Sequence, residues 1–176
     1  EDGEFGMVDP YVMYDNMMNK YRWGNAADPS VYLDENNKRM LSNFRRIFGN
    51  LGKALLVAGD TVRAVEAVHR GLEIVPAEKL PYDFFVLGLA EVLLRAGEAE
   101  EGNRIINDVI RYSKNYLEYA VAGNAGLQFG MDYPVGINMQ ALLDINNMAI
   151  DLGMDDLINS VSTDVTRYYN SLYSGN

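Results

Sequence analysis

Four aromatic residues near the start of the chain form the densest group of side chains that could bind a ligand. They are Tyr11, Tyr14, Tyr21 and Trp23. Aromatic rings stack on the flat faces of sugars and bases, so this group is a candidate aromatic platform for such a ligand.

The same stretch has a second interpretation, as the buried face of a helix. If residues 11–22 are helical, Met13, Met17 and Tyr21 step by four along one stripe. Methionine fills gaps in protein cores more often than it lines a sugar site. We therefore expect an N-terminal helix that ends at residues 23–24 and docks on the rest of the chain, with the ligand platform as the alternative.

Residues suited to acid–base, nucleophilic or metal chemistry are scarce. The chain has one histidine and no cysteine, which excludes disulfides, thiolate ligands and multi-histidine metal sites. His69 lies in a helical pattern without a Ser-His-Asp arrangement around it, and we assign it no role. Glu98 and Glu101 follow a turn glycine, where a carboxylate caps a helix. We expect no catalytic residue, no cofactor and no metal.

Charge disfavours partners with phosphate backbones or anionic headgroups. The 176 residues carry a formal charge of −10, with a pI of about 4.5. The densest basic stretch interleaves with a helical apolar pattern and is interpreted as a solvated face. It contains Lys38, Arg39, Arg45, Arg46 and Lys53. We expect no nucleic-acid partner.

Hydropathy and the first residues indicate a piece of a longer protein. No apolar run approaches the length that spans a bilayer, and the opening "EDGEFGMVDP" is neither a signal peptide nor an initiator methionine. We expect one compact domain overall, with a docking helix and loop at 1–33 and helical repeats at 34–176.

Three stretches share the pattern of a helix, a turn at glycine and a second helix. The aligned glycines are Gly59, Gly97 and Gly153. Around Gly59 the apolar residues step by three and four on both sides, as on one face of each helix. Asp60 can cap the helix that follows Gly59, and Asp34 can cap the long helix before it. Pro81 and Asp83 mark the start of an apolar helix.

The first of these units resembles a tetratricopeptide repeat. Its signature positions hold Phe48, Leu51, Gly52, Leu55, Ala64, Val68, Gly71 and Pro76. The second unit keeps the order with Val86, Leu89, Ala90, Leu93, Gly102, Ile106 and Val109 but has Lys114 in place of the proline. The third is looser, with Leu142, Ile145, Ala149, Ile158 and Val165. We expect an all-α, irregular tetratricopeptide-like array of about three helix pairs, with a glycine-rich connector around 120–136.

Helix-pair arrays bind partners in the groove lined by the first helix of each pair. The polar residues expected on that face are Arg46, Asn50, Lys53, Glu91 and Arg95. They form the candidate groove, and the alternative is that they are ordinary solvated positions.

A second resemblance covers nearly the whole chain, from Tyr11 to about Leu172. The stretches "MYDNMMNKYRWGN", "VYLDENNKRMLSNFRRIFGNLGKALL" and "VPAEKLPYDFFVL" closely resemble the C-terminal soluble part of a bacterial membrane family. That family is domain of unknown function 2723, described as protein O-mannosyltransferase-like. The resemblance implies a multi-spanning, glycosyltransferase-like part preceding this chain, and a soluble tail on the periplasmic side of the inner membrane.

We therefore expect a non-enzymatic protein-interaction or scaffolding module, with any transferase chemistry in the preceding membrane part. Its partner would be a polypeptide or the membrane part of the same protein. One alternative is a carbohydrate- or acceptor-binding domain that uses the aromatic platform. Another is a purely structural or dimerising cap.

Overall fold

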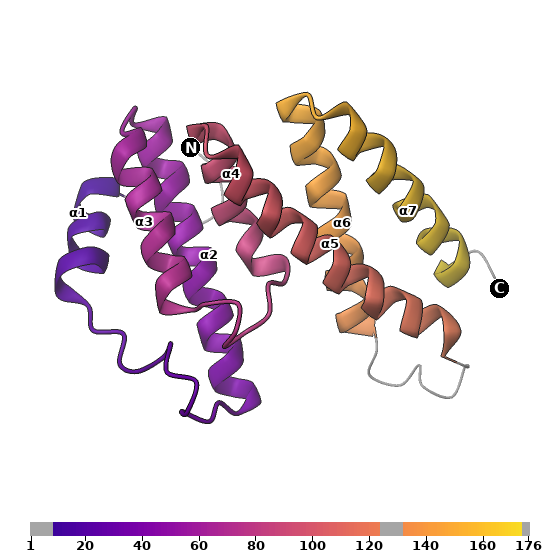
Figure 1. Cartoon of the computed structure of the whole chain (residues 1–176), viewed down its shortest axis with the longest axis horizontal. Coiled ribbons are helices and arrows are strands. Elements are labelled where there is room, and N and C mark those ends of the chain that lie inside the picture. Colours follow the sequence, from indigo (N-terminus) through magenta and orange to yellow (C-terminus); the bar gives the residue numbers. More distant parts are fainter. Residues whose placement is uncertain (1–8, 124–131, 174–176) are drawn as a thin grey trace. The chain divides into compact units, whose positions relative to one another are not determined.

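Helices make up all the regular structure of the described residues, in agreement with the predicted all-α fold. The computed structural model describes residues 9–123 and 132–173. The helices in chain order are α1 (Pro10–Asp15), the π-helical turn η1 (Asn16–Lys20), α2 (Glu35–Val57), α3 (Thr61–Ile74), the 3-10 turn η2 (Phe84–Val86), α4 (Leu87–Ala96), α5 (Ala99–Ala122), α6 (Asp132–Leu152) and α7 (Asp155–Tyr173) (Figure 1). A short N-terminal helix is thus followed by three successive helix pairs, consistent with a tetratricopeptide-like arrangement.

Three glycines end the first helix of each pair, as predicted. Gly59, Gly97 and Gly153 have φ values of 81°, 92° and 67°, a left-handed conformation that costs glycine least. Aspartates cap α2 and α3 as expected. Asn37 N–H donates to Asp34 Oδ1 at 2.8 Å, and Arg63 N–H donates to the Asp60 side chain at 3.1 Å.

The chain folds as two compact units. One compact domain was expected, made of a docking helix and loop at 1–33 and helical repeats at 34–176. Unit 1 comprises the residues up to Pro81 together with Gly88–Asn103. Unit 2 comprises Tyr82–Leu87 together with the residues from Arg104 onward. The N-terminal segment belongs to the same unit as α2 and α3 because it packs against both helices.

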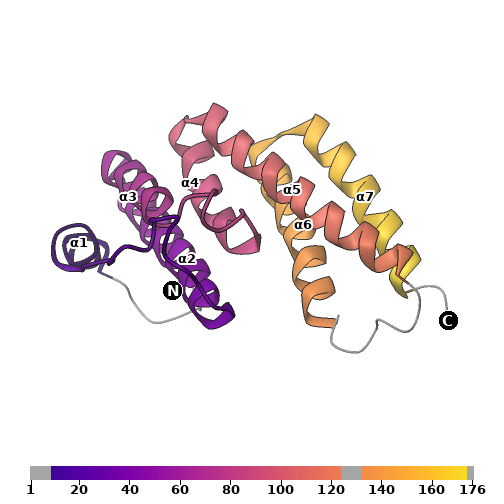
Figure 2. The ribbon, with the colours of Figure 1, turned by 60° about the horizontal axis from the view of Figure 1, so that its bottom comes forward.

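The core of unit 1 lies between α2 and α3, which run side by side in two views (Figures 1 and 2). A Cβ atom on Gly71 would lie 2.8 Å from the Cβ of Phe48, so glycine is what allows the two helices to approach this closely. All signature positions of the first unit except Pro76 are buried. The signature positions of the second unit are also buried apart from Lys114 in the place of the proline, whereas Ile158 and Val165 in the third are half-buried.

The N-terminal helix is shorter than predicted, and its register differs. After α1 the chain forms a π-helical turn, closed by Tyr21 N–H donating to the Asn16 carbonyl at 2.8 Å. The helix ends at Lys20, so Tyr21 lies beyond it and is exposed. Met17 is buried, as the docking stripe required, but the step of four does not extend to Tyr21 because the π turn adds a residue to the helical repeat.

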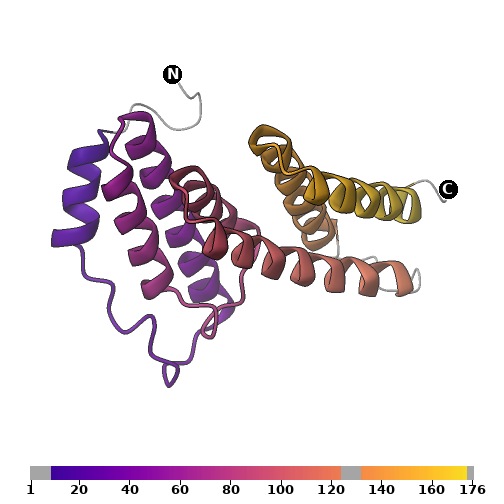
Figure 3. The ribbon, with the colours of Figure 1, turned by 45° about the horizontal axis from the view of Figure 1, so that its top comes forward.

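Unit 2 contains most of α5 and the antiparallel pair α6 and α7, which lie side by side in all three ribbon views (Figure 3). Its fully or nearly fully buried side chains include Val109, Leu117, Leu142, Ile145, Val161 and Tyr168. Residues 124–131 of the expected glycine-rich connector lie outside the described residues, whereas residues 120–122 belong to α5 and residues 132–136 to α6.

A buried arginine holds the connector that follows α3. Arg45 of α2 is 0% exposed. Its guanidinium donates to the carbonyls of Val75 at 3.0 Å and Pro81 at 2.9 Å, and also to those of Pro76 and Leu80. The prediction that Arg45 belongs to a solvated face is wrong, since its charged group turns inward to meet backbone oxygens.

A lysine in the same connector holds the N-terminal loop. The Nζ of Lys79 donates to the carbonyl of Asp28 at 2.6 Å and to that of Val31. The loop between η1 and α2 is therefore attached to the connector that Arg45 anchors, and both contacts lie within unit 1.

Replacing Arg45 with methionine should lower the free energy of unfolding by about 3 kcal/mol, because buried carbonyls lose their donors. Urea denaturation followed by circular dichroism measures the change. Arg39→Met is the matched control, because Arg39 lies on α2 with an exposed side chain. Equal stability of the two variants would contradict the anchoring role of Arg45.

Candidate functional site

The aromatic residues of the candidate platform separate into two pairs. Tyr11 and Tyr14 lie on α1, and the Arg63 guanidinium of α3 is 5.6 Å from the centre of each ring. The Tyr14 hydroxyl donates to Glu66 Oε2 at 2.5 Å. Burial and this hydrogen bond raise the pKa of Tyr14 to about 12. This pair therefore attaches α1 to α3 and does not share a surface for stacking with Trp23.

Trp23 packs between the N-terminal segment and α2. Its ring centre lies 5.1 Å from that of Phe44 and 5.2 Å from that of Phe48. The indole N–H donates to the Met17 carbonyl at 3.3 Å, and Tyr21 meets the indole edge-on at 6.0 Å. Because one part of Trp23 packs on the core, the indole is held in a fixed orientation and remains half-buried.

A pocket of about 500 Å³ opens beside Trp23. Its lining consists of Met17, Lys20, Tyr21, Arg22, Trp23, Phe44 and Ile47. The apolar and aromatic side chains come from η1, the following segment and α2, and two cations belong to the same lining. All of these residues lie in unit 1. We call this the Trp23 pocket.

The two cations of the Trp23 pocket differ in their partners. Lys20 is paired with Asp15 at 2.5 Å and donates to Asn16 Oδ1 at 3.1 Å. Arg22 is exposed and has no hydrogen-bond or ion-pair partner within the described part of the chain. No described residue therefore competes with an anionic group placed at the pocket for the charge of Arg22.

Three of the five residues of the candidate groove contact one another, so their charges are paired within the protein. Glu91 of α4 accepts from Lys53 of α2 at 2.5 Å and from Arg95 at 2.9 Å. Burial alone would raise the pKa of Glu91, but these two cations outweigh it and hold the pKa below its usual value. Arg46 lies two turns and Asn50 one turn before Lys53, and both are exposed like it.

His69 contacts two carboxylates, an arrangement that the sequence reasoning missed. The Nε2 atom of His69 on α3 lies 2.8 Å from Glu98 Oε2 and 3.9 Å from Glu101 Oε2. The glutamates stand just before and within the first turn of α5. Their spacing of three residues predicts a shared face, but the approach of α3 to this turn is a tertiary contact that no local pattern reports.

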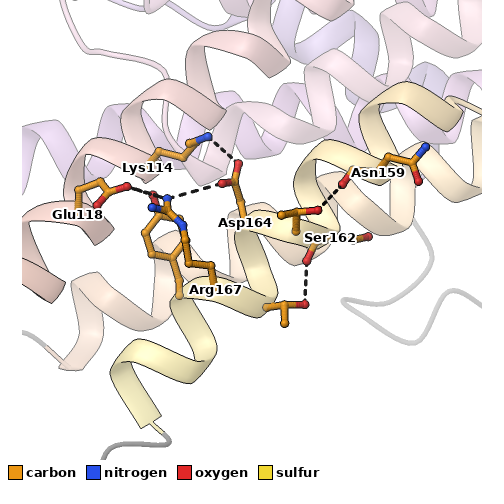
Figure 4. A network of polar contacts seen from close by, with 9 residues as sticks. Lys114, Glu118, Asn159, Ser162, Asp164 and Arg167 are labelled. Carbon is orange, nitrogen blue, oxygen red and sulfur yellow. Dashed lines mark hydrogen bonds and ion pairs between the residues drawn. The ribbon is translucent and has the colours of Figure 1, made fainter.

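A polar network joins α5 to α7 in unit 2 (Figure 4). Lys114 pairs with Asp164 at 2.6 Å, and Arg167 pairs with Glu118 at 2.6 Å. Arg167 also reaches Asp164 at 3.6 Å. Each acid of this network faces a cation from the neighbouring helix, so the group is a structural cross-link between α5 and α7.

Tyr168 is a buried member of this network. It is 1% exposed, and its hydroxyl donates to Glu118 at 2.9 Å. Burial, followed by that hydrogen bond, raises the pKa of Tyr168 to about 12. Hydrogen bonds from Tyr168 and Arg167 hold the pKa of Glu118 below its usual value.

Comparisons with known proteins add no assignment, because no family model, curated protein or solved structure matches the chain. Among the described residues, no helix is both long enough and apolar enough to cross a membrane.

Replacing Tyr168 with phenylalanine should flatten the dependence of stability on alkaline pH. The pKa of Tyr168 is raised from 10.0 to about 12 in the folded protein. The contribution of Tyr168 to the free energy of unfolding is therefore complete below about pH 10 and is lost as the pH rises through about 12. Urea unfolding at about pH 9 and about pH 11 measures the slope. The exposed neighbour offers the control variant Tyr169→Phe, and equal slopes for both variants would contradict this assignment.

Proposed function

We propose that the chain is a non-enzymatic interaction module that binds an acidic segment of a partner polypeptide. The segment would insert one of its apolar side chains into this module. The Trp23 pocket carries this proposal. It combines an apolar and aromatic lining with Arg22, a cation that is not neutralised within the described part of the protein.

The size and lining of the pocket suit a large apolar side chain. A volume of about 500 Å³ lies within the range of ligand pockets. Aromatic residues and arginine are also the residue types that contribute most to binding at protein interfaces. Because the chain carries a formal charge of −10, the positive charge of Arg22 is a local feature that favours a carboxylate beside the bound side chain.

A carbohydrate is less well matched to this pocket. Sugar recognition needs several polar groups that fix the orientation of the hydroxyls as well as a ring to stack on. The lining side chains with polar groups are Lys20, Tyr21, Arg22 and Trp23, and the Trp23 N–H is already used by Met17. The separation of Tyr11 and Tyr14 from this pocket also removes half of the stacking surface that a platform would need.

The resemblance to the domain of unknown function 2723 family supports a larger context for the module. We propose that it is the tetratricopeptide-like tail of a membrane glycosyltransferase-like protein, on the periplasmic side of the bacterial inner membrane. In that position the module would recruit or present a polypeptide to the membrane part.

The candidate groove is the second surface on which such a segment would bind. Arg46, Asn50 and Lys53 are exposed on one stripe of α2. Lys53 is already paired with Glu91, so this stripe ranks below the Trp23 pocket. Binding to the groove would be lost when the three residues are changed together to alanine, which leaves the pocket lining intact.

Titration of the intrinsic fluorescence of Trp23 tests the pocket directly, since it is the one tryptophan of the chain. A peptide with a phenylalanine flanked by aspartates should shift or quench the emission in a saturable way. Arg22→Glu should weaken this binding at least about tenfold, because it places like charges together. Arg39→Glu makes the same change of charge outside the pocket lining and should bind as the wild type does.

Each other outcome selects a different function. A response to mannose oligosaccharides but not to the peptide would replace the proposal with the carbohydrate-binding alternative. Loss of peptide binding in the triple alanine variant but not in Arg22→Glu would move the site to the groove. No response to either ligand, with a concentration-dependent mass in analytical ultracentrifugation, would indicate a dimerising cap.

A further inference from the structure

We propose that His69, Glu98 and Glu101 form a binding site for a divalent transition-metal ion, with zinc as the best match. The three side chains supply one imidazole nitrogen and two carboxylate oxygens. Their ligand atoms all lie within 4.8 Å of one another. This site uses other residues than the Trp23 pocket and goes beyond the proposed function.

The distances are close to those of an assembled site. Zinc bonds of about 2.1 Å in tetrahedral geometry place neighbouring ligand atoms about 3.4 Å apart. The observed separations from His69 Nε2 are 2.8 Å to Glu98 and 3.9 Å to Glu101. Small side-chain rotations would therefore bring the three atoms to equal distances from one ion, without movement of the helices.

Helix capping does not account for the position of Glu98. A capping carboxylate accepts from the free N–H groups of its own first turn. The hydrogen bond that the Glu98 carboxylate makes within the described residues goes instead to His69 on α3. Its side chain thus turns away from its own helix and toward the imidazole.

The chemistry of the cluster also suits a cation. Two carboxylates and one imidazole supply the oxygen and nitrogen donors that zinc binds. All three side chains are half-buried.

The donor set indicates which ion is bound and what the site offers. Imidazole selects zinc and its first-row neighbours over magnesium and calcium, which prefer oxygen ligands alone. Three protein ligands leave a fourth position of the tetrahedron for water or for a carboxylate of a partner. The ion would also connect α3 to the start of α5 within unit 1.

The composition of the chain allows a clean test with zinc chloride alone. His69 is the one histidine and there is no cysteine, so the imidazole resonances in an NMR titration report a single site. We expect these resonances to shift with one equivalent of zinc, the melting temperature to rise, and chelator to reverse both effects. Unchanged resonances at millimolar zinc would overturn the proposal.

Isosteric variants separate a three-ligand site from binding to a lone imidazole. Glu98→Gln and Glu101→Gln should each weaken zinc binding at least about tenfold, since a neutral amide is a poor ligand. Glu100→Gln is the matched control, because Glu100 is exposed in the same helical turn. Circular dichroism confirms that the variants are folded. Wild-type affinity in both Glu98→Gln and Glu101→Gln would show adventitious binding to His69 and overturn the proposal.

Discussion

The insertion of Arg45 into the interior is the constraint on which the rest of unit 1 depends. A guanidinium that is 0% exposed must satisfy its donors or destabilise the fold. It does so on the carbonyls of the connector after α3, which has no helix or strand to satisfy them. Because Lys79 of that connector then holds the N-terminal loop, the contacts of Arg45 and Lys79 connect two irregular segments to α2.

The Trp23 pocket lies beside Arg45 along α2. On α2 the side chain of Arg45 turns inward, whereas Phe44 and Ile47 on the flanking positions remain half-buried and line the pocket. The N-terminal segment supplies the other wall, and Trp23 fixes it in place by packing on Phe44 and Phe48. The docking and ligand interpretations of the aromatic cluster are therefore not exclusive, since the residue that docks the segment also forms the wall of the pocket.

Features set by local chemistry could be predicted from the sequence, and those set by tertiary contacts could not. The turn at Gly59 and the cap at Asp60 depend on a few neighbouring residues, and periodicity correctly placed Phe48 and Leu51 in the core. The π turn in η1 and the contact between His69 and Glu98 depend on what packs nearby, so no local pattern reports them. Arg45 is the instructive error, because its spacing of four from Leu41 and three from Phe48 already placed it on the apolar stripe of α2. The prediction for Arg45 followed the charge of its side chain and not its position on that stripe.

The α5–α7 network of unit 2 and the candidate sites of unit 1 differ in how their charges are matched. In unit 2 the acids Glu118 and Asp164 are matched by Arg167 and Lys114, and the network closes on itself. In unit 1, Arg22 has no hydrogen-bond or ion-pair partner within the described residues, and two carboxylates lie beside His69. Since a cation lines one site and carboxylates belong to the other, the two sites suit different ligands. Occupation of one site by an acidic segment would leave the other available to a cation.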